Sequence, residues 1–475
     1  MAQLSVIPDR HLKELLIFTK LVALNYKNSS MKLYLNYQKK APLLFILLSI
    51  CVSLQAQINQ QIKKAAYADS LRLVEIFKDL HQHPELGFME VRTAAIVTKE
   101  LKSLGYEVIS GIAKTGVAGI FKNGEGKVVM YRADMDALPV KERTGLSYAP
   151  TTTGIKEDGT ETPVMHACGH DSHTTWLLGV AKLMMTFKNE WKGTLVLIAQ
   201  PAEEMVQGAR AMVQDKMYER GIPVPDYLFG MHSKAIAVGK IENGFAERFA
   251  VTDQLDVIFT GIGGHGSAPE MTKDPVVMGA AAIMQYQTII SRNIAAQEAA
   301  VLTVGAFNAG VANNVIPQTA LLKLNIRWFN EKTRNTLLNN IKAINEGIAI
   351  ANNLPKELYP TLTMKGNAFP LVNDTGMVNK INAALTPVLK SDNIITNTPS
   401  IMGSEDFHHL VIHNNKTVYD YMFIGIANPA LVAKAKLEGK SAPFSAHNDN
   451  YRVDLSAIPF GTLVGTLAVL ELFKK

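Results

Sequence analysis

Apolar segments that predict buried strands alternate with a helical segment in the first half of this chain. Residues 127–133 (KVVMYRA) and 194–199 (TLVLIA) are nearly continuous apolar runs, as in strands that are covered on both faces. Residues 174–187 lie between them and have the pattern of a helix, and a further strand is expected at 226–231. This alternation predicts an α/β fold in which helices cover a mainly parallel sheet.

The segment from 251 to 366 has a different order of elements. Its predicted elements follow the order βαββαβ and are residues 254–259, 275–290, 300–307, 320–328, 332–351 and 358–364. That order is typical of a four-stranded ferredoxin-like sandwich. Because α/β elements resume near residue 370, we interpret 251–366 as an α+β domain inserted into a larger domain formed by 57–250 and 367–475.

Residues 1–56 have the pattern of a leader. An apolar run at 41–54 follows Lys39 and Lys40 and precedes a small residue, which is typical of a secretory signal peptide. The run is shorter than the ~20 residues of a membrane span, so an uncleaved anchor is the second interpretation. The first 30 residues do not fit a signal, and we expect Met31 to be the true start. The sequence therefore predicts an exported protein, periplasmic or secreted.

The chain beyond this leader is nearly neutral and contains one cysteine. It has 41 Lys and Arg against 40 Asp and Glu, so nothing in it indicates a nucleic-acid partner. Loss of the leader removes Cys51 and leaves Cys168, so no intramolecular disulfide can form. A lone thiol in an exported protein is a liability unless something occupies it, and a metal ion would do so.

Acids and a histidine follow the ends of several predicted strands. Asp136 follows the first of them, Glu203 and Glu204 follow the strand that ends at Ala199, and His232 follows another. In open α/β sheets, ligands bind beyond the carboxyl ends of the strands, so these side chains should converge. Such convergence from separate strands is hard to explain by stability alone.

The tetrapeptide Cys168-Gly169-His170-Asp171 adds a thiolate and an imidazole. Gly169 allows both neighbouring side chains to turn toward one centre, because glycine adopts backbone angles that other residues avoid. Asp171, like Asp136, could hydrogen-bond a ligating imidazole from behind.

Each of these residues has an ordinary explanation when it stands alone. A cysteine near a histidine is most often a small buried hydrophobe beside a surface imidazole, and adjacent glutamates are most often solvated. Single histidines such as His232 or His447 are most often structural. Together, however, thiolate, imidazole and carboxylate are the inventory of a site at which a metal activates water.

Motifs along the chain resemble the metal-dependent aminoacylase and carboxypeptidase family. Within it they are similar to the amidohydrolase branch of hippuricase, bacterial N-acyl-amino-acid hydrolases and plant auxin-conjugate hydrolases. The motifs occur in order from about residue 70 to the end, and they are LHQHPELGFME (80–90), YRADMDALPV (131–140), MHACGHDSH (165–173), QPAEE (200–204), GMHS (230–233), GGHGSAPE (263–270), NNVIP (313–317), GSEDF (403–407) and AHNDNYRVD (446–454). MHACGHD and PAEE together are highly specific.

The resemblance implies a set of metal ligands. By match to the motifs they would be Cys168, His170, Glu204, His232 and His447. Five ligands exceed what one tetrahedral ion with an open position needs, which favours two divalent ions per subunit, zinc or manganese, with a thiolate that could bridge them. Glu203 is then the carboxylate left over, and it could act as general base and afterwards as general acid.

The resemblance also assigns roles to the inserted segment. It implies that 251–366 is a lid and dimerisation domain, and that His265 reaches the active site of the partner subunit in a homodimer to stabilise the oxyanion. Asn314, Arg327 and Gly403 match family positions that contact the substrate. Two features depart from the family pattern and concern the substrate pocket: Glu270 stands where this branch commonly has histidine, and residues 151–162 are additional.

We therefore expect a metal-dependent amidohydrolase that cleaves the amide bond of N-acyl amino acids or small peptide-like conjugates. A dipeptidase or carboxypeptidase of the same fold would differ only in the acyl group that its pocket accepts. A non-catalytic binding protein should have lost ligands or the base, and none is missing here. A serine hydrolase has no support, because the chain has no GxSxG motif.

Overall fold

The computed structural model describes residues 55–474 except 157 and 368. The predicted signal peptide at 41–54 and Cys51 lie outside the described residues. The chain divides into two compact units, 1–61 and 62–475, and the larger unit is described below. Among the helices of the described ranges, none is long and apolar enough to cross a membrane.

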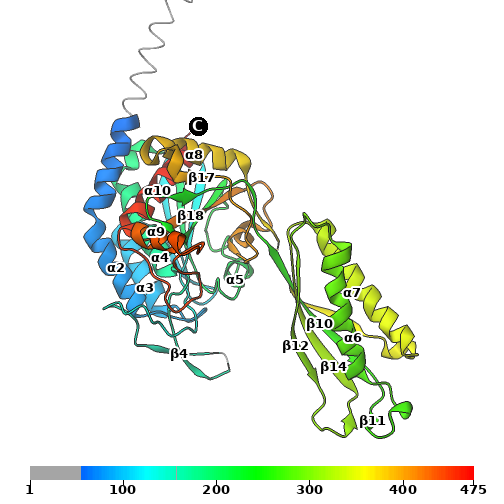
Figure 1. Cartoon of the computed structure of the whole chain (residues 1–475). Coiled ribbons are helices and arrows are strands. Elements are labelled where there is room, and N and C mark those ends of the chain that lie inside the picture. The colour runs from blue at the N-terminus through cyan, green and yellow to red at the C-terminus, as the bar shows by residue number, and fades with distance from the viewer. Residues whose placement is uncertain (1–54, 157, 368, 475) are drawn as a thin grey trace, which may run out of the picture. The chain divides into compact units, whose positions relative to one another are not determined.

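An eight-stranded sheet forms the centre of the larger part of this unit (Figure 1). In spatial order its strands are β1 (Glu107–Ile112), β2 (Gly116–Asn123), β6 (Gly193–Gln200), β3 (Val128–Asp134), β7 (Tyr227–Ala237), β18 (Val418–Ala427), β8 (Ile241–Glu242) and β17 (Ile394–Ile395). Neighbours among β6, β3, β7 and β18 are parallel. β1, β2 and β6 pair antiparallel, as do β18 and β8.

The sheet is therefore mixed, and the prediction of a mainly parallel sheet holds only for its central strands. It is wrong near the β1 edge, where β1 and β2 are joined by a tight turn in which Ala113 and Lys114 have positive φ. A turn this short can join only antiparallel strands, since parallel neighbours need a long crossover.

Helices cover the sheet on both faces. α4 (His170–Thr186) and α10 (Ala457–Phe473) pack against each other, and α10 is apolar all round because it is buried on almost every side. On the opposite face, α5 (Gly208–Gln214) contributes Ala209 and Met212 to a core cluster with Met130 and Val196 of the central strands. The other helices of this part are α2 (Ser70–Gln82), α3 (Val91–Ser103), α8 (Thr375–Leu389) and α9 (Pro429–Leu437).

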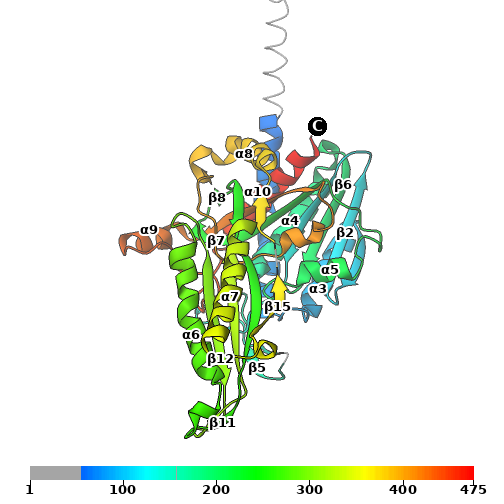
Figure 2. The same cartoon turned by 90° about the vertical axis from the view of Figure 1, so that its right-hand side faces the viewer.

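A second, four-stranded sheet is formed by the inserted segment. Its antiparallel strands lie in the order β12 (Val301–Ala309), β14 (Thr319–Trp328), β10 (Val251–Thr260) and β15 (Thr361–Asn367). α6 (Pro275–Thr288) and α7 (Glu331–Ala351) lie side by side against this sheet (Figure 2) and share its core. The predicted βαββαβ order is confirmed, and the sheet has the strand order of a ferredoxin-like sandwich.

The chain passes between the two sheets along a short ribbon. β9 (Ala246–Phe249) and β16 (Leu371–Asn373) pair antiparallel there. The second sheet begins at Val251 and ends at Asn367, but the division of the chain into domains at these points stays a prediction. Two small antiparallel sheets complete the description: β4 (Thr153–Ile155) and β5 (Glu161–Pro163) form a hairpin, and β11 (Gly264–His265) pairs with β13 (Val315–Ile316), which follows α6 and β12 in the sequence.

Candidate metal centre

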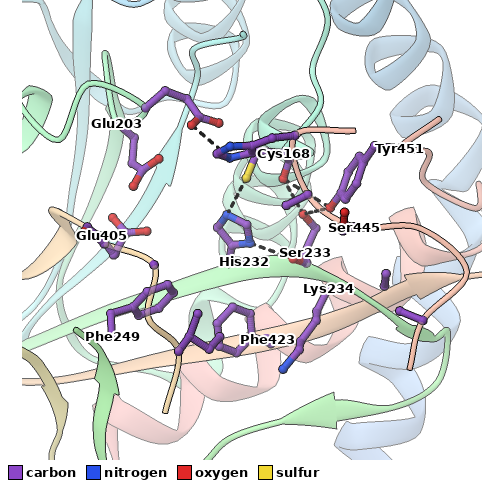
Figure 3. A pocket seen from close by; sticks show the side chains of 18 of the residues that line it. Cys168, Glu203, His232, Ser233, Lys234, Phe249, Glu405, Phe423, Ser445 and Tyr451 are labelled. Atoms are coloured by element: carbon purple, nitrogen blue, oxygen red, sulfur yellow. Dashed lines mark hydrogen bonds and ion pairs between the residues drawn. The ribbon is translucent and has the colours of Figure 1, made fainter. Parts of the chain in front are cut away.

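A cavity of about 750 Å³ lies beyond the carboxyl end of β6 and beside β7. Five of the six residues predicted as metal ligands or base line it, namely Cys168, Glu203, Glu204, His232 and His447. His170 lies behind them and is fully buried. His232 is placed inside β7, which runs on to Ala237, and does not follow the end of a strand. Figure 3 shows Cys168, Glu203 and His232 around the cavity.

The thiol of Cys168 faces the ring of His232. Their Sγ and Nε2 atoms are 3.4 Å apart, and the Nδ1 of His232 lies 2.7 Å from the carbonyl oxygen of Ser233. Because a carbonyl oxygen only accepts, Nδ1 carries the proton and Nε2 presents its lone pair to the thiol. Gly169 has φ +81°, and a Cβ there would lie 2.5 Å from the Ser233 hydroxyl oxygen, so no other residue fits between the two ligands of this tetrapeptide.

Glu204 lies between two histidines. Its Oε1 is 3.7 Å from Nε2 of His170, and its Oε2 is 3.2 Å from Nε2 of His447. Among the described residues, ligand atoms of Cys168, Glu204 and His447 form one group within 4.8 Å, and those of His170, Glu203 and Glu204 form another. Glu204 belongs to both groups.

Two buried atoms of this cluster have no hydrogen-bond partner, and they are Nε2 of His170 and Oε1 of Glu204. Buried polar atoms without partners are costly, so native structures rarely keep them. The distance between them is too long for a hydrogen bond but suits two ligands of one divalent ion. The residues present therefore fit a metal centre.

Negative charge is crowded around this cluster. Burial raises the pKa of Glu204 to about 8. Burial, and then the carboxylates of Glu405 and Glu204, raise the pKa of Glu203 well above its usual range. Burial and the same Glu204 also raise the pKa of the Cys168 thiol. A bound cation would favour the ionised forms, which are the forms that bind metals.

Asp136 connects the two sides of the cluster. Its Oδ1 lies 3.2 Å from Nδ1 of His170 and accepts the backbone N–H of Glu203 at 3.0 Å, while its Oδ2 accepts the backbone N–H of Glu204 at 3.0 Å. Burial lowers the pKa of His170, but the carboxylates of Asp134 and Asp136 outweigh burial and raise this pKa to about 10. One carboxylate thus orients an imidazole and the turn that carries both glutamates.

The side chain of Asp171 is hydrogen-bonded to His81 and to the N–H of Ser172 and not to a predicted metal ligand, so its assignment as their hydrogen-bond partner is wrong. Its Oδ2 lies 2.6 Å from Nδ1 of His81, whose Nε2 lies 3.0 Å from Glu142. The reason is that α4 begins at His170, and neighbouring side chains on a helix point in different directions. Burial lowers the pKa of His81, but Asp171 and Glu142 outweigh burial and raise this pKa to about 9.

A buried ion-pair network beneath the cluster was not predicted. Arg132 is fully buried, and its guanidinium lies 2.7 Å from Asp134 and 3.0 Å from Glu405. Glu405 lines the same cavity as Glu203 (Figure 3). His173 was also missed, and its Nδ1 lies 2.5 Å from Asp134. The sequence signal for this network was Arg132 itself, which stands in an apolar strand. A buried cation needs a carboxylate partner, so an ion pair could have been expected there.

The structure separates the predicted substrate residues into two groups. Arg327 and Gly403 line the cavity, and one Nη of Arg327 donates to the carbonyl oxygen of Met402. His265, in β11, and Asn314, just before β13, are exposed and do not line the cavity.

The two departures from the family pattern also lie outside the cavity lining. Glu270 is exposed, in a short 3-10 helix at Pro269–Met271, and residues 151–162 contribute the β4–β5 hairpin. Neither feature contributes a described residue to the metal cluster.

Comparison with known proteins decides the family. Residues 130–469 match the model of peptidase family M20/M25/M40. The chain belongs to this family. It is 37% identical over 374 residues to hippurate hydrolase of Campylobacter jejuni (76% of this chain, 93% of that protein). It is 37% identical over 347 residues to N-acetyl-L-cysteine deacetylase of Bacillus subtilis (72% and 78%).

Solved structures agree with this assignment. A dinuclear metal binding peptidase of the M20 family from Bacillus subtilis has a TM-score of 0.69 at 26% identity, with 86% of this chain and 99% of that chain covered. The resemblance to the aminoacylase and carboxypeptidase family, in its amidohydrolase branch, is thereby confirmed.

Proposed function

We propose that this M20 family member is a metal-dependent amidohydrolase that cleaves the amide bond of N-acyl amino acids or small peptide-like conjugates. The observation that carries the proposal is the convergence of a thiol, imidazoles and two adjacent glutamates on one cavity. Relatives at 37% identity are named for hydrolysis of hippurate and deacetylation of N-acetyl-L-cysteine, which supports this substrate class.

The cofactor is two divalent metal ions, zinc or manganese. The residues that would hold them are Cys168, His170, Glu204, His232 and His447. When bound, such ions lower the pKa of a water molecule toward ~7 and polarise the scissile carbonyl.

Glu203 is the proton carrier of the proposed reaction. Its carboxylate accepts a proton from the attacking water, whose oxygen forms a bond to the carbonyl carbon, and it then delivers that proton to the amine nitrogen as the C–N bond breaks. Burial and Glu405 raise the pKa of Glu203, and bound cations would counter this by favouring the carboxylate that accepts the proton.

The substrate would lie between this cluster and the inserted segment. Arg327, from β14, would bind the substrate carboxylate, because a planar guanidinium matches a carboxylate with two parallel hydrogen bonds. Gly403 lines the same cavity, and Phe249 and Phe423 give the acyl group apolar surroundings.

We also propose that residues 251–366 act as a lid and that two copies of the chain form a homodimer through them. β12 is an edge strand of its sheet, and Val277, Met284 and Phe307 are apolar side chains exposed on α6 and β12. An unprotected edge beside apolar surface is typical of a strand that pairs with its copy across a two-fold axis.

A substrate panel tests the proposed activity. We expect the purified protein to hydrolyse members of a panel of N-acetyl amino acids, N-benzoyl amino acids and dipeptides. Activity should disappear after chelation and return with Zn²⁺ or Mn²⁺, because the proposed reaction depends on bound metal. A dipeptidase or carboxypeptidase is the runner-up, since a carboxypeptidase of Saccharolobus solfataricus is 30% identical over 414 residues. Preferential cleavage of dipeptides would select it, and no cleavage at all would contradict both.

Export is proposed from the leader sequence alone. We expect N-terminal sequencing of the mature protein, recovered outside the cytoplasm of its cell, to begin near Gln57, because small residues precede the signal-peptide cleavage site. A protein that keeps residues 41–54 and sediments with membranes would support an anchor. Recovery of the uncleaved chain in the cytoplasm would contradict export.

A further inference from the structure

The turn that carries Glu203 and Glu204 begins with a strained residue. Ala202 has φ +49°, in the left-handed region that residues with a Cβ rarely adopt. Such a conformation persists only where the surrounding structure holds it. The contacts of this turn therefore determine where the proposed base and one proposed metal ligand lie.

Two buried carboxylates hold the turn through three successive backbone N–H groups. Those of Glu203 and Glu204 donate to Asp136, and that of Ala202 donates to Oε1 of Glu90 at 2.8 Å. Glu90 is fully buried, and its Oε2 accepts the hydroxyl of Thr115 at 2.5 Å. Glu90 does not line the cavity, and its hydrogen bond to the turn is made at the backbone of Ala202.

The segment that contains Glu90 also approaches the turn from a second point. A Cβ on Gly87 would lie 3.1 Å from both Cα and Cβ of Ala202 and 3.1 Å from Sδ of Met205. Glycine at this position therefore permits the close approach of two backbones.

We propose that Glu90 is a positioning residue for the turn formed by Ala202, Glu203 and Glu204, called the catalytic turn below. It would act through its hydrogen bond to the Ala202 N–H. The proposal rests on the function proposed above, because the turn matters for catalysis only if Glu203 transfers the proton. Loss of the bond should let Ala202 relax toward an unstrained conformation and displace the carboxylates of Glu203 and Glu204. A displacement on the order of 1 Å is enough to lower a rate by about a hundredfold.

The same segment supplies a matched control. The carboxylate of Glu85 accepts the N–H groups of Arg92 and Thr93 at the start of α3, both at 2.8 Å. It therefore has the same kind of bond as Glu90 but holds a helix and not the catalytic turn. Glu85→Leu should lower Tm without changing kcat.

Glu90→Leu should lower kcat by roughly tenfold to a hundredfold, with KM within about threefold of the wild-type value. Because Glu204 lies on the same turn, a chelator should also remove metal faster from Glu90→Leu than from Glu85→Leu or the wild type. Glu90→Gln keeps a carbonyl oxygen that can accept the Ala202 N–H, so it should retain most of kcat. A merely structural role predicts instead a lower Tm with kcat and metal release unchanged.

A folded Glu90→Leu protein with kcat and metal release within about twofold of Glu85→Leu would overturn the proposal. If Glu90→Leu does not fold, Gly87→Ala is the second test. The methyl group added at position 87 would press on Ala202 and displace the same turn. A loss of kcat in Gly87→Ala would support the positioning role, and wild-type kcat there would overturn it. Metal release remains measurable if the wild type cleaves nothing in the panel, so failure of the proposed function can be distinguished from failure of this proposal.

Discussion

Glu203→Gln is expected to keep its metal ions while kcat falls by roughly 10²-fold to 10⁴-fold, the span typical of general acid-base catalysis. Glutamine has nearly the shape of glutamate but cannot accept a proton from water at neutral pH. The backbone N–H that fixes Glu203 on Asp136 is unchanged by the substitution, so the turn should stay in place. Metal content by elemental analysis and kcat with the best substrate are the two measurements.

The neighbouring glutamate provides the control for this prediction. Glu204 faces His170 and His447 and is a proposed ligand, so Glu204→Gln should lose metal affinity as well as activity. The two variants differ by one position and remove one carboxylate each. If Glu203→Gln turned over at a near-normal rate while fully loaded with metal, Glu203 would have no part in proton transfer.

The inserted sheet could be predicted from the sequence because its signals are local. The four strands and two helices of this sheet each carry their own apolar pattern, and the order of the elements then selects one topology. The edge of the large sheet could not be predicted in the same way. Strand direction there depends on the short turn at Ala113 and Lys114, and the expectation for parallel neighbours came from the central strands alone.

Site residues were predictable where a motif fixes their local geometry. Gly169 allows Cys168 and His170 to stand two positions apart beside one centre, and the structure gives Gly169 the positive φ that this requires. The hydrogen-bond partner of Asp171, His81, could not be predicted from a motif. It depends on where α4 begins and on how α2, which carries His81, packs against it.

Long-range pairs were the least accessible to sequence reasoning. Arg132 and Glu405 are 273 positions apart and meet only because the chain returns to the large sheet after the insertion. A buried arginine signals that it needs a carboxylate, but the sequence contains 42 acidic residues and does not say which one pairs with it. Charge networks of this kind become visible only in the folded chain.

Mixing two inactive variants should restore activity if the dimer proposal is correct. His265 is exposed and does not line the cavity of its own chain, and we expect it to act at the site of the partner subunit. Each active site would then combine Glu203 of one chain with His265 of the partner. A mixed dimer of His265→Ala and Glu203→Gln subunits has one site with both defects and one with neither. With random reassortment about half of the dimers are mixed, so about a quarter of all sites should be intact.

A second mixture makes this experiment decisive. Glu203 and Glu204 line the cavity of the same chain, so every site in a mixed dimer of Glu203→Gln and Glu204→Gln subunits keeps one defect and should stay inactive. Recovery in the first mixture and not in the second is the pattern that only a site shared between subunits produces. If the first mixture also stays inactive, although exchange of subunits is shown by a tag on one of them, His265 does not complete the partner's site. The edge of β12 and the exposed apolar residues of α6 would then need another explanation.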